Sequence, residues 1–151
     1  NASPDGIERP HVGYYVGAIL WERLTELRQV MEHGESVLEA VSAARRMQDH
    51  LVAFRDLLGA EVGQVLDMLT PLESYLSAIF NTQHLIVAMD QKPARRGRKP
   101  ASQPTADPTL EALKQHMNAH LDSLADALPS VWASVNSTIF RRAFALAVAA
   151  P

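Results

Sequence analysis

Apolar residues recur three or four positions apart along most of the chain, and this spacing constrains the fold more than any other feature of the sequence. Between residues 14 and 31, for example, Val16, Leu20, Leu24 and Leu27 share one face of a helix, and the charged residues fall largely off that face. No segment alternates apolar and polar residues over the length of a strand. We therefore predict an all-α protein: an antiparallel bundle of four to five amphipathic helices with one long, basic, proline-rich loop.

Glycine and capping residues indicate the first two helix boundaries. Gly34 should end the first helix in the left-handed conformation that favours glycine. Ser36 and Glu39 have the spacing of a capping box, in which each side chain satisfies a backbone amide at the start of the next helix. The apolar face of this second helix continues to Leu58, so we expect the helix to extend up to Gly59.

Prolines divide the rest of the chain into further predicted helices. A short helix over 61–69 should end before Thr70 and Pro71, which begin a new helix, because proline fits the first helical position. The apolar stripe predicted for that helix is Leu72, Leu76, Ile79, Phe80, Ile86 and Val87. Asp107 and Pro108 should begin the following helix in the same way, and its predicted apolar stripe is Leu110, Leu113, Met117, Leu121 and Leu124. Pro129 should end that helix and begin the last one, because an interior proline removes a helical hydrogen bond.

The chain of 151 residues is long enough for one domain with its own core. We predict a disordered tail over 1–9 and a single helical-bundle domain over 10–151, in which 91–108 is a flexible basic linker between two halves. The absence of cysteine excludes disulfides, thiolate metal sites and cysteine nucleophiles. No apolar run reaches the ~18 residues of a membrane span, and the first ten residues lack the pattern of a secretory signal, so we expect a cytoplasmic protein without a membrane span.

Basic charge is concentrated in this linker. Five of the 14 basic residues fall within 92–99, and the rest of the chain keeps nine basic against 17 acidic residues, a net charge of −8. The linker has no apolar side chain larger than proline, so it cannot build a core of its own. Two interpretations stay open: a solvated tether between helices, or a contact for a polyanion.

The residues Arg-Arg-Gly-Arg-Lys-Pro at 95–100 resemble the AT-hook, a short motif that lies in the minor groove of A·T-rich DNA. The resemblance implies that the Arg-Gly-Arg core enters the narrow groove and that the flanking basic residues contact phosphates. It covers six residues and departs from the motif at Lys99, where the motif has proline. The nucleic-acid-binding residues predicted from this segment are Lys92, Arg95, Arg96, Gly97, Arg98 and Lys99.

Sequence motifs of enzyme chemistry are absent, including the phosphate-binding loop, the dinucleotide fingerprint and the nucleophile elbow. His116 and His120 are four residues apart on a predicted helix, a spacing that can hold a metal if a third donor such as His84, His50 or Asp122 joins them. The histidine and glutamate patterns of hemerythrin and of ferritin-like di-iron proteins do not occur. We therefore predict no catalytic residue, no cofactor and no metal, with His116 and His120 as the candidates for a metal site if one exists.

Two arginine pairs lie on otherwise apolar helices. Arg45 and Arg46 precede Met47, and Arg141 and Arg142 stand in the last predicted helix. Inside a bundle such pairs could hold an anion, but arginines that pair with acidic residues at the surface explain the pattern as well.

Three functions from different classes remain. The first, which we favour, is a non-enzymatic interaction or regulatory module that self-associates as a homo-oligomer or binds a protein partner. The second is a nucleic-acid-associated protein that acts through 92–99. The third is a helical bundle that binds a small ligand or a metal.

Overall fold

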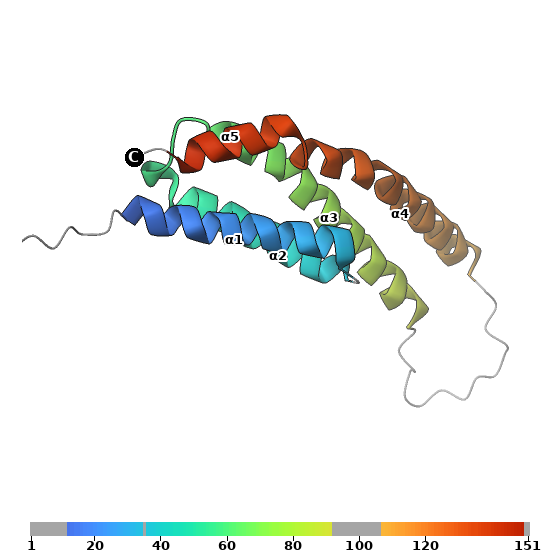
Figure 1. Cartoon of the computed structure of the whole chain (residues 1–151). Coiled ribbons are helices and arrows are strands. Elements are labelled where there is room, and N and C mark those ends of the chain that lie inside the picture. Colours follow the sequence, from blue (N-terminus) through green and yellow to red (C-terminus); the bar gives the residue numbers. More distant parts are fainter. Residues whose placement is uncertain (1–11, 35, 92–106, 150–151) are drawn as a thin grey trace, which may run out of the picture.

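The structure, a computed structural model, describes residues 12–34, 36–91 and 107–149 (Figure 1). These residues form five α-helices and one short 3-10 helix and contain no strand, which confirms the prediction of an all-α protein. The elements are α1 (Val12–His33), α2 (Val37–Ala53), η1 (Arg55–Leu57), α3 (Val62–Asp90), α4 (Pro108–Val135) and α5 (Thr138–Val148). The predicted tail over 1–9 and most of the predicted linker over 91–108 lie outside the described residues. Among the helices described, none has both the length and the hydropathy that a bilayer-crossing segment requires.

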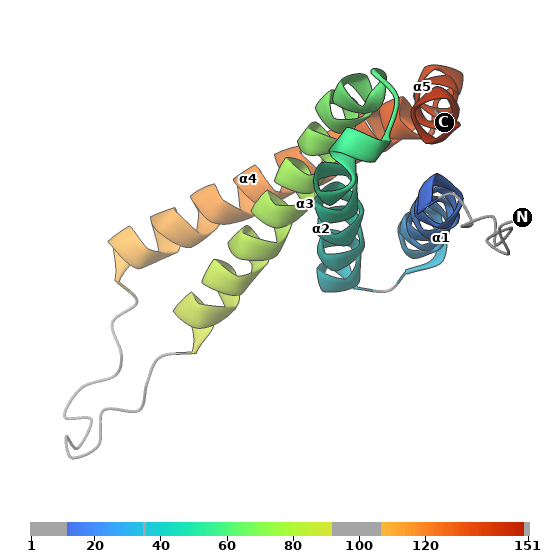
Figure 2. The same cartoon turned by 90° about the vertical axis from the view of Figure 1, so that its left-hand side faces the viewer.

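The helices pack in the order of the chain. α1 and α2 lie antiparallel, α3 packs against the other side of α2, and α4 returns along α3 (Figures 1 and 2). α5 crosses the end of this arrangement and contacts α1, α3 and α4. The far halves of α3 and α4 extend past the α1–α2 pair as a two-helix projection (Figure 2).

The core lies where α1, α2, α3 and α5 converge. Phe144 of α5 is fully buried there, and the ring of Trp21 packs edge-on against it at a centroid distance of 4.7 Å. The loop after η1 passes close to α5, because the Gly59 amide donates a hydrogen bond of 2.8 Å to the carbonyl of Ala147. The largest fully buried side chains are Leu20, Leu24, Leu27, Met47, Leu51, Val65, Leu69, Leu72, Leu76, Val135, Phe140 and Phe144.

The first helix boundary differs in detail from the prediction. Gly34 ends α1 and its amide donates to the carbonyl of Val30 at 2.8 Å, but its backbone is not in the left-handed region. Glycine is needed there for space, because a Cβ would lie 2.2 Å from that same carbonyl oxygen. Ser36 does cap α2, yet its side chain makes no capping hydrogen bond, so the capping box predicted with Glu39 is wrong. Both side chains are exposed, and water can satisfy the same amides.

The second helix is shorter than predicted. α2 ends at Ala53, and the short helix η1 occupies residues 55–57. The third is longer: α3 is one helix of 29 residues that includes Pro71, so the boundary predicted at 70–71 is wrong. Leu69, Leu72 and Leu76 are buried on one face that continues across the proline. Tertiary packing of that unbroken face outweighs the hydrogen bond that Pro71 removes.

α4 likewise continues through Pro129, so the break predicted there is wrong. The chain bends instead at Asn136 and Ser137, where the Ser137 hydroxyl accepts a hydrogen bond of 3.1 Å from the amide of Phe140 and caps α5. This bend turns Phe140 and Phe144 toward the core. The start of α4 is as predicted, because the Asp107 carboxylate accepts from the amide of Thr109 at 3.0 Å and Pro108 is the first helical residue.

Candidate functional site

The two-helix projection is the candidate site, and we call it the arm: Ser77–Asp90 of α3 and Pro108–Leu124 of α4. The two helices are joined near the tip of the arm, where the ammonium group of Lys114 lies 2.7 Å from Oδ1 of Asp90 and 3.9 Å from Oε1 of Glu111. The hydrogen bond to Asp90 raises the pKa of Lys114 above its ordinary value. At the tip, α3 and α4 are therefore held together by an ion pair rather than by a cluster of buried apolar side chains.

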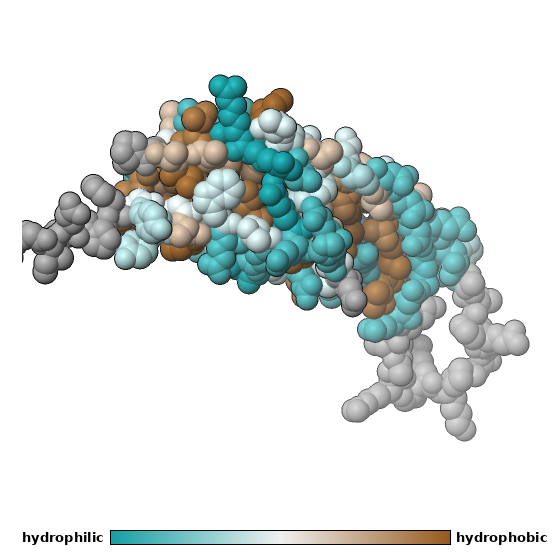
Figure 3. Space-filling model, in the orientation of Figure 1, coloured by the Kyte–Doolittle hydropathy of each residue, from teal (hydrophilic) through white to brown (hydrophobic). Residues whose placement is uncertain are grey.

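Apolar side chains of the arm stay exposed. Leu85 and Val87 of α3 are each 53% exposed, and Leu113 of α4 is 48% exposed. α4 has 28 residues, and the buried residue among them is Val135 at its far end, outside the arm. In the arm, α3 packs on α4 and near its base also borders α2, and this packing leaves part of each apolar stripe uncovered. Figure 3 shows hydrophobic residues (brown) on the arm between hydrophilic ones (teal).

One side of the arm forms a groove with the start of α2. Val37 and Leu38 of α2 and Phe80 and Val87 of α3 line a hollow of about 250 Å³ together with Ser36, Gln83 and His84. The rings of Phe80 and His84 contact each other edge-on at a centroid distance of 4.5 Å. Leu38 is 52% exposed at the rim, so this groove continues the apolar surface of the arm onto α2.

The opposite side of the arm is a second apolar surface. At 100° per residue, Leu85 projects on the other side of the α3–α4 contact from Phe80 and Val87. Because α4 runs antiparallel to α3, the same period places Leu113 on the Leu85 side and Lys114, which pairs with Asp90, on the groove side. Sequence patterning assigned Leu113 to a buried stripe and did not single out Leu85. The signal for Leu85 was an apolar residue one position before the predicted stripe residues Ile86 and Val87.

The nucleic-acid-binding residues predicted from sequence lie outside the described residues: Lys92, Arg95, Arg96, Gly97, Arg98 and Lys99. The residues that flank this segment are described, and Gln91 and Asp107 both stand at the tip of the arm (Figures 1 and 2).

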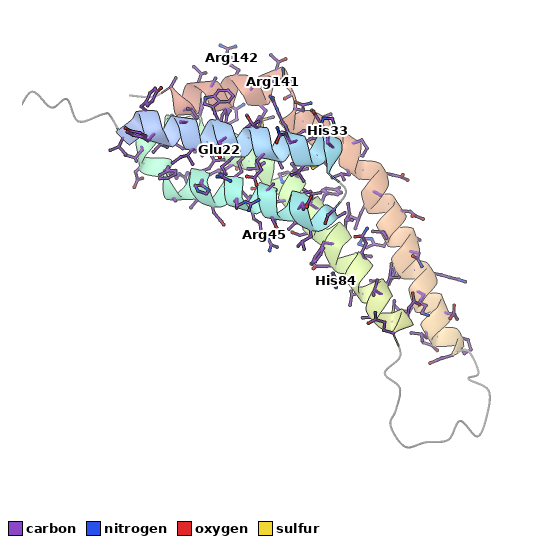
Figure 4. The ribbon with its side chains drawn as sticks, turned by 60° about the horizontal axis from the view of Figure 1, so that its bottom comes forward. Glu22, His33, Arg45, His84, Arg141 and Arg142 are labelled. Atoms are coloured by element: carbon purple, nitrogen blue, oxygen red, sulfur yellow. The ribbon has the colours of Figure 1, made fainter. Side chains whose placement is uncertain are left out.

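His116 and His120 are exposed on α4. In the parts of the chain that the structure describes, no three histidine, aspartate or glutamate side chains gather closely enough to hold a metal ion. His84, one of the suggested third donors, lies on α3 beside the α2 groove and contacts Phe80 (Figure 4). The arrangement thus does not bring a third donor to His116 and His120 within the described chain.

The two arginine pairs do not converge. Arg45 on α2 and the Arg141–Arg142 pair on α5 point to opposite sides of the molecule (Figure 4). Nε of Arg45 donates to Glu73 of α3 at 2.9 Å, and Arg46 pairs with Glu26 of α1. Acidic partners at the surface agree with the sequence pattern, and these partners come from neighbouring helices.

On α5, Nη2 of Arg141 donates to the side-chain oxygen of Asn136 at 3.1 Å. Arg142 borders a separate hollow that is lined by Glu61, Ile139 and Leu146. Arg142 is exposed, and it borders this hollow from α5 while Glu61 borders it from the start of α3.

Comparison of the chain with protein families, with curated proteins and with solved structures gave no match. Function is therefore inferred from the arm and its exposed residues.

Proposed function

We propose that this chain is a non-enzymatic helical interaction module whose arm packs against helices of a protein partner. The observation that carries the proposal is the incomplete burial of the arm, in which Leu85, Val87 and Leu113 are about half exposed. In a stable helical fold such stripes face other helices, and here the contact between α3 and α4 leaves these three side chains partly uncovered.

The free energy that would favour binding of a partner comes from the exposed apolar area of the arm. Full burial of a leucine or valine side chain stabilises by about 1.5–3 kcal/mol, and these three side chains have realised roughly half of that. A partner that adds two helices to the arm would complete a four-helix arrangement and cover the remainder. The gain is available only on association.

The charge pattern of α3 supports the same use. Between Glu73 and Asp90 the helix has no aspartate, glutamate, lysine or arginine, although it is partly exposed over that stretch. The buried centres of protein interfaces are depleted in charged residues, because desolvation of an unpaired charge opposes binding. A helix that only had to stay in water would have no reason to avoid charge over four turns.

Photo-crosslinking tests the proposal. A photoreactive phenylalanine analogue at Leu85 should give covalent protein adducts in the cells that make the protein. The same analogue at Gln115, an exposed position of α4 on the side that faces away from α3, is the control and should give few adducts. Equal yields from the two positions, or none from Leu85, would contradict a binding surface on the arm.

A second candidate function is contact with nucleic acid through 92–99. The observation in its favour is the concentration of charge, because five of the 14 basic residues fall within 92–99, in the segment between the end of α3 and the start of α4. Non-specific binding by such a charge cluster has a Kd on the order of 10⁻⁴ to 10⁻⁶ M at physiological salt.

The double variant Arg96→Ala/Arg98→Ala tests this second function. It should weaken binding to A·T-rich duplex DNA and flatten the dependence of affinity on salt, because fewer counterions are released. Leu85→Glu is the control, and it should leave DNA binding nearly unchanged unless association through the arm is required. An unchanged mobility-shift assay for the double variant would dispose of the idea.

A further inference from the structure

Two histidines of the arm remain available to a ligand. His116 and His120 are four residues apart on α4, and both side chains are exposed. Their neighbours Lys114 and Asn118 make polar contacts of their own, Lys114 with carboxylates and Asn118 with a backbone carbonyl. Among the residues that the structure describes, neither imidazole ring has a hydrogen-bond or aromatic partner that would compete with a ligand.

The helical period brings the two rings to the same point in space. Four residues advance a helix by about 6 Å and turn it by about 40°, so the two Cβ atoms lie about 5–6 Å apart on one face. Bonds between a metal ion and an imidazole nitrogen are about 2.0–2.1 Å long, and a histidine pair with this spacing can bind one ion across a single turn. The geometry requires an unbroken helix, and α4 continues from Pro108 to Val135.

We infer that His116 and His120 form an exchangeable site for a divalent transition metal such as Zn²⁺ or Cu²⁺. Imidazole nitrogen suits these ions, whereas Mg²⁺ and Ca²⁺ prefer oxygen ligands. Within the described chain no third histidine, aspartate or glutamate joins the pair, so water completes the coordination shell and the ion exchanges readily. The site goes beyond the proposed function and does not depend on it.

The surroundings of the pair admit a cation but supply no catalytic base. α4 contains three acidic residues and one lysine, a net charge of −2. The ammonium group of that lysine, Lys114, is held by Asp90 on the groove side of the arm, whereas the helical period places the two histidines on the Leu113 side. A helical histidine pair that hydrolyses peptides has a glutamate directly after the first histidine as its general base, and Met117 occupies that position here. The pair therefore forms a binding site rather than a hydrolytic centre.

A bound metal ion would strengthen the part of α4 that is least buried. The buried residue of this helix is Val135 at its far end, so the arm half of α4 depends on partial burial and on the ion pair at the tip. A ligand that binds only the folded state stabilises that state by mass action, and the two histidines meet only when the helical turn between them is formed. Zn²⁺ should therefore slow amide hydrogen exchange around residues 112–120.

Titration of the untagged chain with Zn²⁺ tests the site. Calorimetry should find a single bound ion per wild-type chain, with Cu²⁺ binding more tightly and Mg²⁺ not at all. His116→Ala and His120→Ala should each weaken Zn²⁺ binding by about tenfold or more, because the chelate is lost. His33→Ala is the control: it removes an exposed histidine that has no second histidine four residues away, and it should leave the affinity unchanged.

A variant with the same number of histidines tests the spacing. His120→Gln/Asn118→His places the two histidines two residues apart on nearly opposite sides of the helix, and it should bind Zn²⁺ as weakly as His120→Ala. Wild-type affinity in this variant would overturn the chelate, and affinity that survives the loss of either histidine would overturn its location. A wild-type chain that gives no binding heat at millimolar Zn²⁺ would overturn the site itself. All the variants should keep the helical circular dichroism spectrum, because the substituted side chains are exposed.

Discussion

Arg45 on α2 and Glu73 on α3 join two helices by a hydrogen-bonded ion pair, in which Nε of the arginine lies 2.9 Å from Oε1 of the carboxylate. The Ser77 hydroxyl donates to the same oxygen at 2.6 Å, and Nη2 of Arg45 reaches the Ser77 hydroxyl at 3.2 Å. The hydrogen bond from Ser77, together with the hydrogen bond and the charge of Arg45, holds the pKa of Glu73 below its ordinary value against the opposing effect of partial burial. This triangle fixes α2 on α3 just below the base of the arm.

The lowered pKa of Glu73 predicts a pH dependence of stability. A carboxyl group whose pKa is lower in the folded state stabilises the fold above its unfolded pKa of about 4.3 and loses that contribution as the pH falls through the folded value. Glu73→Gln should therefore lower the free energy of unfolding by roughly 0.5–1 kcal/mol at pH 7, a modest figure because Arg45 is largely exposed. It should also make that free energy less dependent on pH below about 5.

Urea unfolding at a series of pH values measures both effects. Asp49→Asn on the exposed side of α2 removes a carboxylate without such partners and serves as the control. A wild-type pH profile below 5 that Glu73→Gln leaves as steep as before would show that Glu73 is not the titrating group.

Helix type could be predicted from sequence, whereas helix continuity could not. The apolar period identified the buried faces of α1, α2 and α3, because burial of Leu24, Met47 or Leu72 depends on spacing that the sequence displays. Proline was given too much weight as a boundary. At Pro71 and Pro129 apolar residues on both sides of the proline pack in or against the same hydrophobic core, and that energy is set by tertiary contacts that a local pattern does not contain.

The candidate site was harder to predict than the fold. Periodicity tells which residues share a face, but not whether another helix covers that face, so Leu113 was expected in the core and is half exposed. The segment 92–99 differs from the rest of the chain in its basic composition, yet it lies outside the described residues. The arm exists because α3 and α4 extend beyond the start of α2. Both helices are this long because neither is broken at its proline, where the sequence predicted a break.

Replacement of Pro71 by alanine should stabilise the protein. Alanine restores the amide that pairs with the carbonyl of Asp67 four residues earlier, and it removes the clash of the proline ring with that turn. A more flexible unfolded chain offsets part of the gain, so we expect the free energy of unfolding to rise by about 1–2 kcal/mol. Pro108→Ala is the matched control, because the first helical position regains no hydrogen bond. Equal effects of the two substitutions in chemical unfolding would argue against an unbroken α3.

Gly34 and Gly63 should respond in opposite ways to alanine. A Cβ at Gly34 would lie 2.2 Å from the carbonyl oxygen of Val30, so the α1–α2 turn must shift and the free energy of unfolding should fall by roughly 1–3 kcal/mol. A Cβ at Gly63, in the first turn of α3, meets nothing within 4 Å. Gly63→Ala should raise stability by a few tenths to ~1 kcal/mol through helix propensity alone. Thermal unfolding of the two variants distinguishes them, and a stabilised Gly34→Ala would mean that the turn differs from the one described.

The contact between Phe144 and Trp21 gives the core an optical reporter. Phe144 is fully buried, whereas Trp21 is 43% exposed and depends on that ring for its packing. Phe144→Ala should cost about 3–5 kcal/mol of unfolding free energy and shift the Trp21 emission to longer wavelength as water reaches the indole. Trp132→Phe in the background leaves Trp21 as the single tryptophan.

Leu146→Ala, on the exposed side of the same helix, should cost less than ~1 kcal/mol and leave the emission unchanged. Phe144→Leu should recover much of the loss because it refills most of the cavity. If Phe144→Ala and Leu146→Ala proved equally mild, α5 could not be the helix that closes the core, and the position of the arm relative to the rest of the molecule would have to be reconsidered.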